Sequence, residues 1–219
     1  MNIVIVGPGN DPKRFGTNFV NKAEADGHTV TKFSYRLETS SPEEIEVMFE
    51  NTLSDLDNID LFVYNTIGGF YPGNVEDYTS EHAVNYEQWQ KGILINAALP
   101  HMMTLKCLQK MNESSKTVFL TSSASYLINR DNYLQMAGYF GTKGAMNQLM
   151  RSLAEYNDKN SIVCTLAPHI PYDDPSMAEI IMKKLYDTIM SLSRVDTGKI
   201  IQCYPPGEST FYHEGGKKP

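Results

Sequence analysis

Residues 1–16 read MNIVIVGPGNDPKRFG. The apolar run 3–6 shows no polar alternation, which is typical of a strand that helices cover on both faces. A loop rich in glycine and proline follows between Gly7 and Gly16, and a segment with helical spacing of apolar residues starts at about residue 15. A strand, a glycine loop and a helix in this order predict the first unit of a parallel α/β sheet, because parallel strands need a crossover that is usually helical.

The same alternation of apolar runs and helical segments continues along the rest of the chain. We expect strands at 2–6, 29–34, 60–65, 116–121, 161–166 and 199–203, and helices at 15–26, 42–55, 86–110, 138–157 and 176–192. This series predicts a single α/β domain over residues 1–219 with a doubly wound, mostly parallel sheet. The stretch from about 205 to 219, rich in glycine, proline and charge, is expected to form a surface tail.

The composition excludes several classes of function. The 219 residues include 19 Lys and Arg against 26 Asp and Glu, a formal net charge of −7, with no Lys/Arg-rich run. This balance argues against nucleic acid or an anionic membrane surface as the main partner. No apolar run is long enough to span a membrane and the three cysteines form no C-x-x-C pair, so we expect a cytoplasmic protein. The five histidines show no ligand spacing, and we expect no metal site.

The glycine loop after the first strand is a candidate phosphate site. In doubly wound sheets a ligand sits beyond the carboxyl ends of the strands, with its phosphates at the N-terminus of the first helix. Gly7, Gly9 and Gly16 permit a tight turn and a close approach of the backbone to a pyrophosphate. Their spacing does not match G-x-G-x-x-G, so an ordinary glycine–proline turn is the alternative interpretation.

The end of the second strand bears on the choice between NAD(H) and NADP(H). An acid at this place would accept a hydrogen bond from the ribose 2′-hydroxyl and repel a 2′-phosphate. The chain instead has Ser34 and Arg36, and Lys13 or Arg14 could approach the same phosphate from the glycine loop. The pattern favours NADP(H) over NAD(H). The alternative is that these cations are solvated surface residues.

Tyr139 and Lys143, within the stretch YFGTK, form the most informative pair. Residues four apart share one face of a helix, and a nearby cation lowers the phenol pKa from its usual value of about 10. Such a tyrosine can pass a proton to a carbonyl oxygen as a hydride reaches the carbon. Upstream, the strand 117–121 runs into a Ser-Ser-Ala-Ser cluster at 122–125, where a hydroxyl can bind the reacting oxygen. A surface Tyr–Lys pair is the alternative.

With these motifs the chain resembles the short-chain dehydrogenase/reductase superfamily over nearly its whole length. The resemblance implies a Rossmann-type sheet, a nicotinamide cofactor and a catalytic set that maps onto Asn96, Ser123, Tyr139 and Lys143. In this mapping Asn96 would hold a proton-relay water and Ser123 the substrate oxygen. Tyr139 would be the acid/base, with Lys143 as its cationic partner and as a ligand of the nicotinamide ribose.

Further positions match the cofactor side of the family pattern. Asn65 and Gly68 lie in an Asn-Thr-Ile-Gly turn that stands where the family has Asn-Asn-Ala-Gly, and Pro168 stands where the family has Pro-Gly beside the nicotinamide. The glycine loop is longer than the family pattern. Only about 25 residues separate the second predicted strand from the third, so the family's additional strand with its adenine-side Asp has no room.

The serine of the catalytic set has more than one candidate. The gap between Ser123 and Tyr139 is longer than is usual in the family. Ser122 and Ser125 are therefore alternatives to Ser123.

The sequence thus predicts an NAD(P)H-dependent oxidoreductase that transfers hydride to a carbonyl or conjugated C=N group of a small molecule. Stretches such as Gly-Lys-Ile-Ile-Gln at 198–202 resemble dihydropteridine reductase, although that enzyme lacks the serine cluster and has an Asp in place of Ser34. A second alternative is a non-catalytic NADP(H)-sensing protein that uses the same fold. The family resemblance also implies a homodimer or homotetramer built on the helices at 86–110 and 138–157.

Overall fold

The computed structural model describes residues 1–66, 86–122, 137–156, 161–168, 170 and 174–203. Within these ranges the strands are β1 (Asn2–Val6), β2 (Thr29–Phe33), β3 (Leu61–Tyr64), β4 (Lys116–Leu120), β5 (Ile162–Pro168) and β6 (Ile200–Cys203). They form one sheet in the order β2-β1-β3-β4-β5-β6, and every pair is parallel. The predicted single-domain, doubly wound α/β fold is confirmed. The predicted tail at 205–219 lies outside the described residues.

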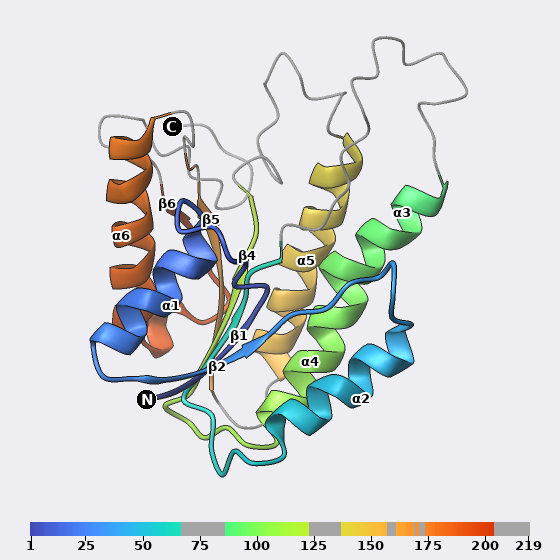
Figure 1. The fold of residues 1–219 in the computed structure, drawn as a ribbon, viewed down its shortest axis with the longest axis horizontal. Coiled ribbons are helices and arrows are strands. Elements are labelled where there is room, and N and C mark those ends of the chain that lie inside the picture. Colours follow the sequence, from blue (N-terminus) through green and yellow to red (C-terminus); the bar gives the residue numbers. More distant parts are fainter. Residues whose placement is uncertain (67–85, 123–136, 157–160, 169, 171–173, 204–219) are drawn as a thin grey trace.

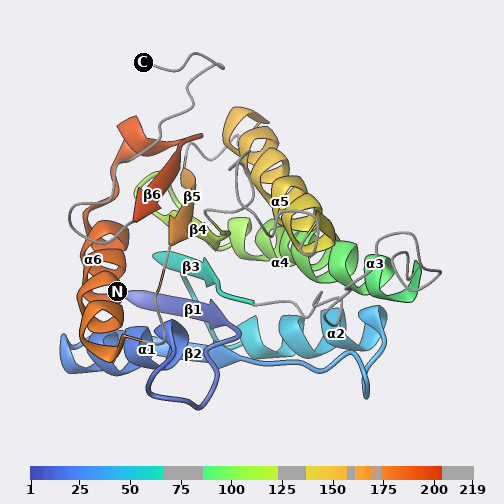
Figure 2. The same cartoon turned by 90° about the horizontal axis from the view of Figure 1, so that it is seen from above.

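Helices cover both faces of the sheet (Figure 1). They are α1 (Phe15–Ala25), α2 (Pro42–Leu53), α3 (Tyr86–Ile93), the π-helical segment η2 (Leu94–Ala98), α4 (Leu99–Leu108), α5 (Ala137–Tyr156), α6 (Pro175–Ser191) and the 3₁₀ segment η5 (Arg194–Asp196). Figure 2, seen from above, shows α1 and α6 on one side of the strands and α2, α4 and α5 on the other. Among the described helices, none combines the length and the apolar character needed to span a bilayer.

The two faces of the central strands each contribute to a separate apolar core. On β1, Ile3 and Ile5 belong to the cluster that includes α1 and α6, whereas Val4 and Val6 belong to the cluster with α2, α4 and α5. All four residues of β3 are buried. Burial on both faces explains why these strands appear in the sequence as unbroken apolar runs.

The strand boundaries agree with the sequence-based expectation to within one residue, except at the end of β5. Strand β5 continues to Pro168 rather than ending at residue 166, because Ala167 and Pro168 pair with Gln202 and Cys203 of β6. Proline has no N–H to donate, so it is tolerated at the end of a strand. Pro168 therefore stands at the carboxyl edge of the sheet.

The topology places a ligand crevice beside β1. Strand β1 lies between β2 and β3, so the chain winds away from it in both directions. Ligands of doubly wound sheets bind at the carboxyl ends of the strands at such a switch point. Here those ends are Val6, Phe33 and Tyr64.

Candidate functional site

A cavity of about 430 Å³ opens at this switch point. Its walls come from the glycine loop, the start of α1, the loop after β2, the end of β3, and the helical segments α3 and η2. The lining residues are Gly7, Pro8, Gly9, Arg14, Phe15, Gly16, Ser34, Tyr35, Arg36, Leu37, Glu38, Asn65, Thr66, Lys91 and Ile95. The cavity lies within the usual size range of small-molecule sites.

Three glycines shape the loop wall. Gly7 and Gly9 both have φ near +71°, in the left-handed region that favours glycine. A Cβ on Gly16 would overlap the Pro8 carbonyl oxygen and the Asn65 side-chain amide, so the first turn of α1 packs directly on the loop. Asn65 braces the same loop, because its Nδ2 donates to the Gly7 carbonyl oxygen at 2.8 Å.

The N-terminus of α1 is open toward the cavity. Its N-cap residue Arg14 makes no side-chain capping hydrogen bond, and the first turn contains no acid. By contrast, Ser41 and Glu44 form a capping box at α2, and Asp174 caps α6. The uncapped N–H groups of α1 and the positive end of its dipole suit an anion. The loop and helix therefore fit a pyrophosphate.

The loop after β2 supplies polar side chains to the opposite wall. Ser34 and Arg36 are exposed and line the cavity. Arg14 also lines it and lies 3.8 Å from Asp11, whereas Lys13 is exposed and does not contribute to the wall.

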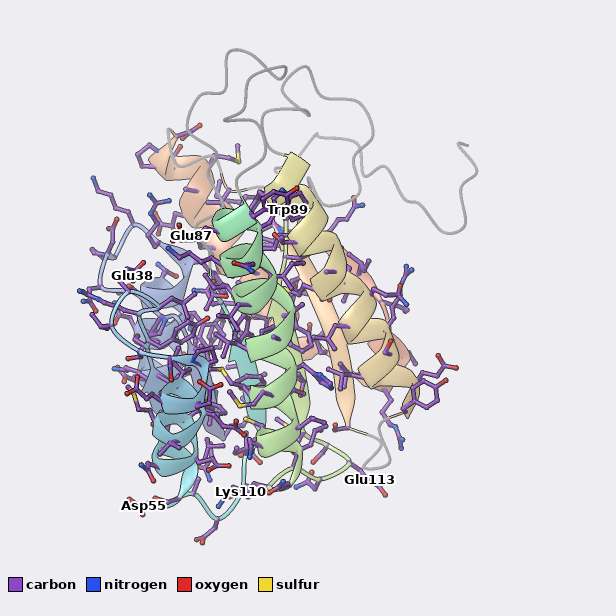
Figure 3. All side chains as sticks on the ribbon, turned by 90° about the vertical axis from the view of Figure 1, so that its right-hand side faces the viewer. Glu38, Asp55, Glu87, Trp89, Lys110 and Glu113 are labelled. Carbon is purple, nitrogen blue, oxygen red and sulfur yellow. The ribbon has the colours of Figure 1, made fainter. Side chains whose placement is uncertain are left out.

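Two charged lining residues were not predicted from the sequence. Glu38 lies on the loop after β2, and Lys91 lies on α3, where it also pairs with Glu87 at 2.8 Å. Glu38 and Glu87 are labelled in Figure 3. No local sequence pattern connects these residues, because they come from elements that are far apart in the chain.

Asn96 lies on a π-helical turn that Pro100 imposes. In an α-helix the Asn96 carbonyl would accept from residue 100, which is proline and has no N–H. The helix instead forms a π turn over 94–98, and the Leu99 N–H donates to the carbonyl of Leu94. The predicted helix 86–110 is therefore divided into α3, η2 and α4, and Asn96 lies in η2.

The Asn96 side chain is joined to Tyr139 through Thr142. Asn96 is fully buried, and its Nδ2 donates to the Thr142 hydroxyl at 3.0 Å. That hydroxyl donates in turn to the backbone carbonyl of Tyr139, at 3.0 Å. Because the single hydroxyl hydrogen of Thr142 is used there, Asn96 must turn its NH₂ toward Thr142. Its buried Oδ1 then faces away, with no hydrogen-bond partner among the described residues.

Lys143 lies at the carboxyl edge of the sheet. The side chain is 1% exposed, and Nζ donates to the carbonyls of Thr66 at 2.9 Å and Leu120 at 3.1 Å. Burial lowers the pKa of Lys143 from its ordinary value to about 7. Since Thr66 also lines the cavity, this hydrogen bond connects the helix of the Tyr–Lys pair to the glycine pocket.

Tyr139 is half-buried near the start of α5. Figure 3 shows Trp89 at the amino end of α3, close to this part of α5. A Cβ on Gly141 would lie 3.2 Å from the Trp89 ring, so the glycine permits the two helices to approach. The first turns of α5, which carry Tyr139, therefore pack against α3.

Several predicted site residues lie outside the described ranges. These are Gly68, Ser123 and Ser125. Ser122, the alternative that is described, is half-buried just beyond β4. In the described part of the chain, no three His, Cys, Asp or Glu side chains are grouped so that they could hold a metal ion.

Comparisons with known proteins agree with this fold. The sequence model of a family described as enoyl-(acyl carrier protein) reductase matches residues 10–189. No curated protein matches the chain by sequence. Among solved structures, BdcA in complex with NADPH is similar, with a TM-score of 0.68 and 14% identity over 99% of this chain and 98% of that one.

Two further structures show the same fold. A Serratia marcescens short-chain dehydrogenase/reductase variant has a TM-score of 0.72 and 13% identity, covering 93% of this chain and 95% of that one. A Brucella ovis oxidoreductase of the same type has a TM-score of 0.67 and 18% identity, covering 92% and 98%.

Proposed function

The chain belongs to the short-chain dehydrogenase/reductase superfamily of nicotinamide-dependent oxidoreductases, and we propose that it reduces a carbonyl or conjugated C=N group of a small molecule with NADPH. The observation that carries this proposal is the hydrogen bond from Lys143 to the carbonyl of Thr66. It joins the Asn96–Thr142–Tyr139 cluster to a pocket whose open helix end and glycine loop suit a dinucleotide.

When bound, the cofactor supplies the hydride. Tyr139 Oη donates its proton to the oxygen or nitrogen of the substrate, which becomes basic as its carbon is reduced. A charged Lys143 stabilises the phenolate that remains, and a pKa near 7 lets this lysine release or regain a proton near neutral pH. Asn96 Oδ1 is a buried acceptor suited to hold a water through which Tyr139 is reprotonated. A serine of the cluster 122–125, Ser123 by family resemblance, orients the substrate.

The first experiment is a parallel titration of the purified protein with NADPH and NADH, followed by nicotinamide fluorescence. We expect both to bind, with NADPH the tighter. The protein is then assayed with ketones, quinones and pterins as acceptors. Binding of NADPH without oxidation by any acceptor would indicate the sensor alternative, and a preference for NADH together with pterin reduction would indicate the dihydropteridine reductase alternative.

Arg36→Ala is expected to weaken NADPH binding by about tenfold or more and to leave NADH binding nearly unchanged. The reason is that a charge-assisted hydrogen bond to a phosphate contributes about 1.5–3 kcal/mol, and only NADPH carries the 2′-phosphate. The measurement is the pair of dissociation constants. Lys13→Ala is the control, because Lys13 is an exposed cation on the same loop system that does not line the cavity. Equal losses for both cofactors would contradict the assignment of Arg36.

Thr142→Val is expected to lower kcat by about tenfold or more, with little change in NADPH affinity. Valine keeps the shape of threonine but leaves the Asn96 NH₂ buried without its acceptor, so the amide can turn over and misdirect Oδ1. Thr142→Ser restores the hydroxyl and should recover most of the activity. If Thr142→Ser were as impaired as Thr142→Val, the restored hydroxyl would not have rescued activity, and the hydrogen bond from Asn96 would not account for the loss.

A further inference from the structure

Tyr64 is an unexpected residue for the centre of a parallel sheet. The other β3 residues are Leu61, Phe62 and Val63, and Tyr64 is as fully buried as they are. A buried phenol requires hydrogen-bond partners. The Tyr64 hydroxyl donates to the Ile95 carbonyl at 2.6 Å and lies 2.8 Å from the hydroxyl of Tyr35.

The Ile95 carbonyl needs a donor from outside its own helix. In an α-helix its partner would be the N–H of Leu99, but this N–H is used by Leu94 in the π turn. The partner for a π-helical bond would be residue 100, which is proline. The Tyr64 hydroxyl therefore donates the hydrogen bond that the Ile95 carbonyl cannot receive from residue 100, because proline has no N–H.

The hydrogen bonds in this chain of groups have a fixed direction. A phenol has one hydrogen, and that of Tyr64 goes to Ile95. Tyr35 must then be the donor in its contact with Tyr64. Tyr35 also lines the cavity, on the loop that carries Ser34 and Arg36. A directed path thus runs from the pocket wall to the residue next to Asn96.

We propose that Tyr35 and Tyr64 are positioning residues that couple occupancy of the pocket to the π turn and so hold Asn96 against Thr142. The coupling rests on the proposed function, which gives the pocket and Asn96 their roles. Burial raises the pKa of Tyr35 to about 12 and the pKa of Tyr64 well above its usual value. Both phenols therefore keep their protons near neutral pH and remain donors.

Amide hydrogen exchange over residues 94–104 tests the proposal without any substrate. We compare the wild type with Tyr64→Phe and Tyr35→Phe, each with and without NADPH. Without NADPH, Tyr64→Phe should exchange about tenfold faster or more in this segment, since the Ile95 carbonyl loses its donor. Tyr35→Phe keeps that bond and should exchange at nearly the wild-type rate. With NADPH, the segment should be protected in the wild type but not in either variant.

A matched control separates this local effect from a general loss of stability. Tyr186 on α6 is also buried and donates to Asp26 at 2.7 Å. It belongs to the apolar core on one face of the sheet, whereas Leu94 and Leu99 of the π turn belong to the core on the other face. Tyr186→Phe should leave exchange at 94–104 unchanged in both conditions. The double variant of Tyr35 and Tyr64 should behave like Tyr64→Phe alone, because Tyr35 acts through Tyr64.

Two results would overturn the proposal. The first is that residues 94–104 of Tyr64→Phe exchange at the wild-type rate. The second is that Tyr64→Phe exchanges faster by a similar factor in all helices and strands, rather than mainly at 94–104. A wild type that fails to bind NADPH by fluorescence would instead refute the proposed function and, with it, the coupling to the pocket. In that case the comparison without NADPH still decides whether Tyr64 holds the π turn.

Discussion

Tyr139→Phe abolishes nearly all turnover and leaves NADPH binding intact: this is the result we expect if Tyr139 is the acid. The substitution removes one hydroxyl and keeps the aromatic ring. Loss of a general acid lowers kcat by about 10²–10⁴-fold. The hydrogen bond from Thr142 to residue 139 goes to the backbone and survives the change. The measurements are kcat with the best acceptor found in the panel and the NADPH dissociation constant by fluorescence.

Tyr156→Phe is the matched control for this prediction. It lies on the same helix α5 and makes the same chemical change, but its side chain is 80% exposed. We expect wild-type kcat from it. Substantial activity in Tyr139→Phe would refute Tyr139 as the proton donor, even if the cofactor bound normally.

The strands were predictable from sequence because both faces of the sheet are covered. Runs such as 3–6 and 61–64 must be apolar throughout, and an unbroken apolar run identifies its own boundaries. The end of β5 was placed too early, because the pairing of Pro168 with Cys203 depends on a strand that comes some 30 residues later. Pairing of this kind leaves no local signal.

The sequence does contain an indication that the helix is interrupted at Asn96, although the apolar periodicity of the helix shows no break there. Apolar spacing continues smoothly from 86 to 110, so one helix was expected. The signal was Pro100, which removes the N–H four residues after Asn96. The Tyr35–Tyr64 contact had no comparable signal. The two residues are 29 positions apart, and they meet only because the sheet places the ends of β2 and β3 at one edge.

Among glycine-to-alanine substitutions in the described residues, Gly16→Ala should disrupt the dinucleotide pocket most. The new Cβ would overlap the Pro8 carbonyl and the Asn65 side-chain amide. The Pro8 carbonyl belongs to the backbone, so it cannot move aside by a change of rotamer. Either the loop or the first turn of α1 must move, and the Asn65–Gly7 hydrogen bond would be strained. We expect NADPH affinity to fall by about 100-fold or more, together with a loss of about 1–3 kcal/mol in the free energy of unfolding.

Gly27→Ala distinguishes damage to the pocket from damage to the fold. Gly27 has φ +81°, so alanine is strained there and should cost about 1 kcal/mol of stability. Apart from Gly27 itself and its two chain neighbours, no described residue has an atom within 4 Å of the Cβ that alanine would add, and Gly27 does not line the cavity. Its NADPH affinity should therefore equal that of the wild type. If Gly16→Ala also bound NADPH normally, the loop at 7–16 would not be the phosphate site. The open end of α1 would then need another explanation, because a helix that is left uncapped at a cavity loses stability that α2 and α6 secure with their capping side chains.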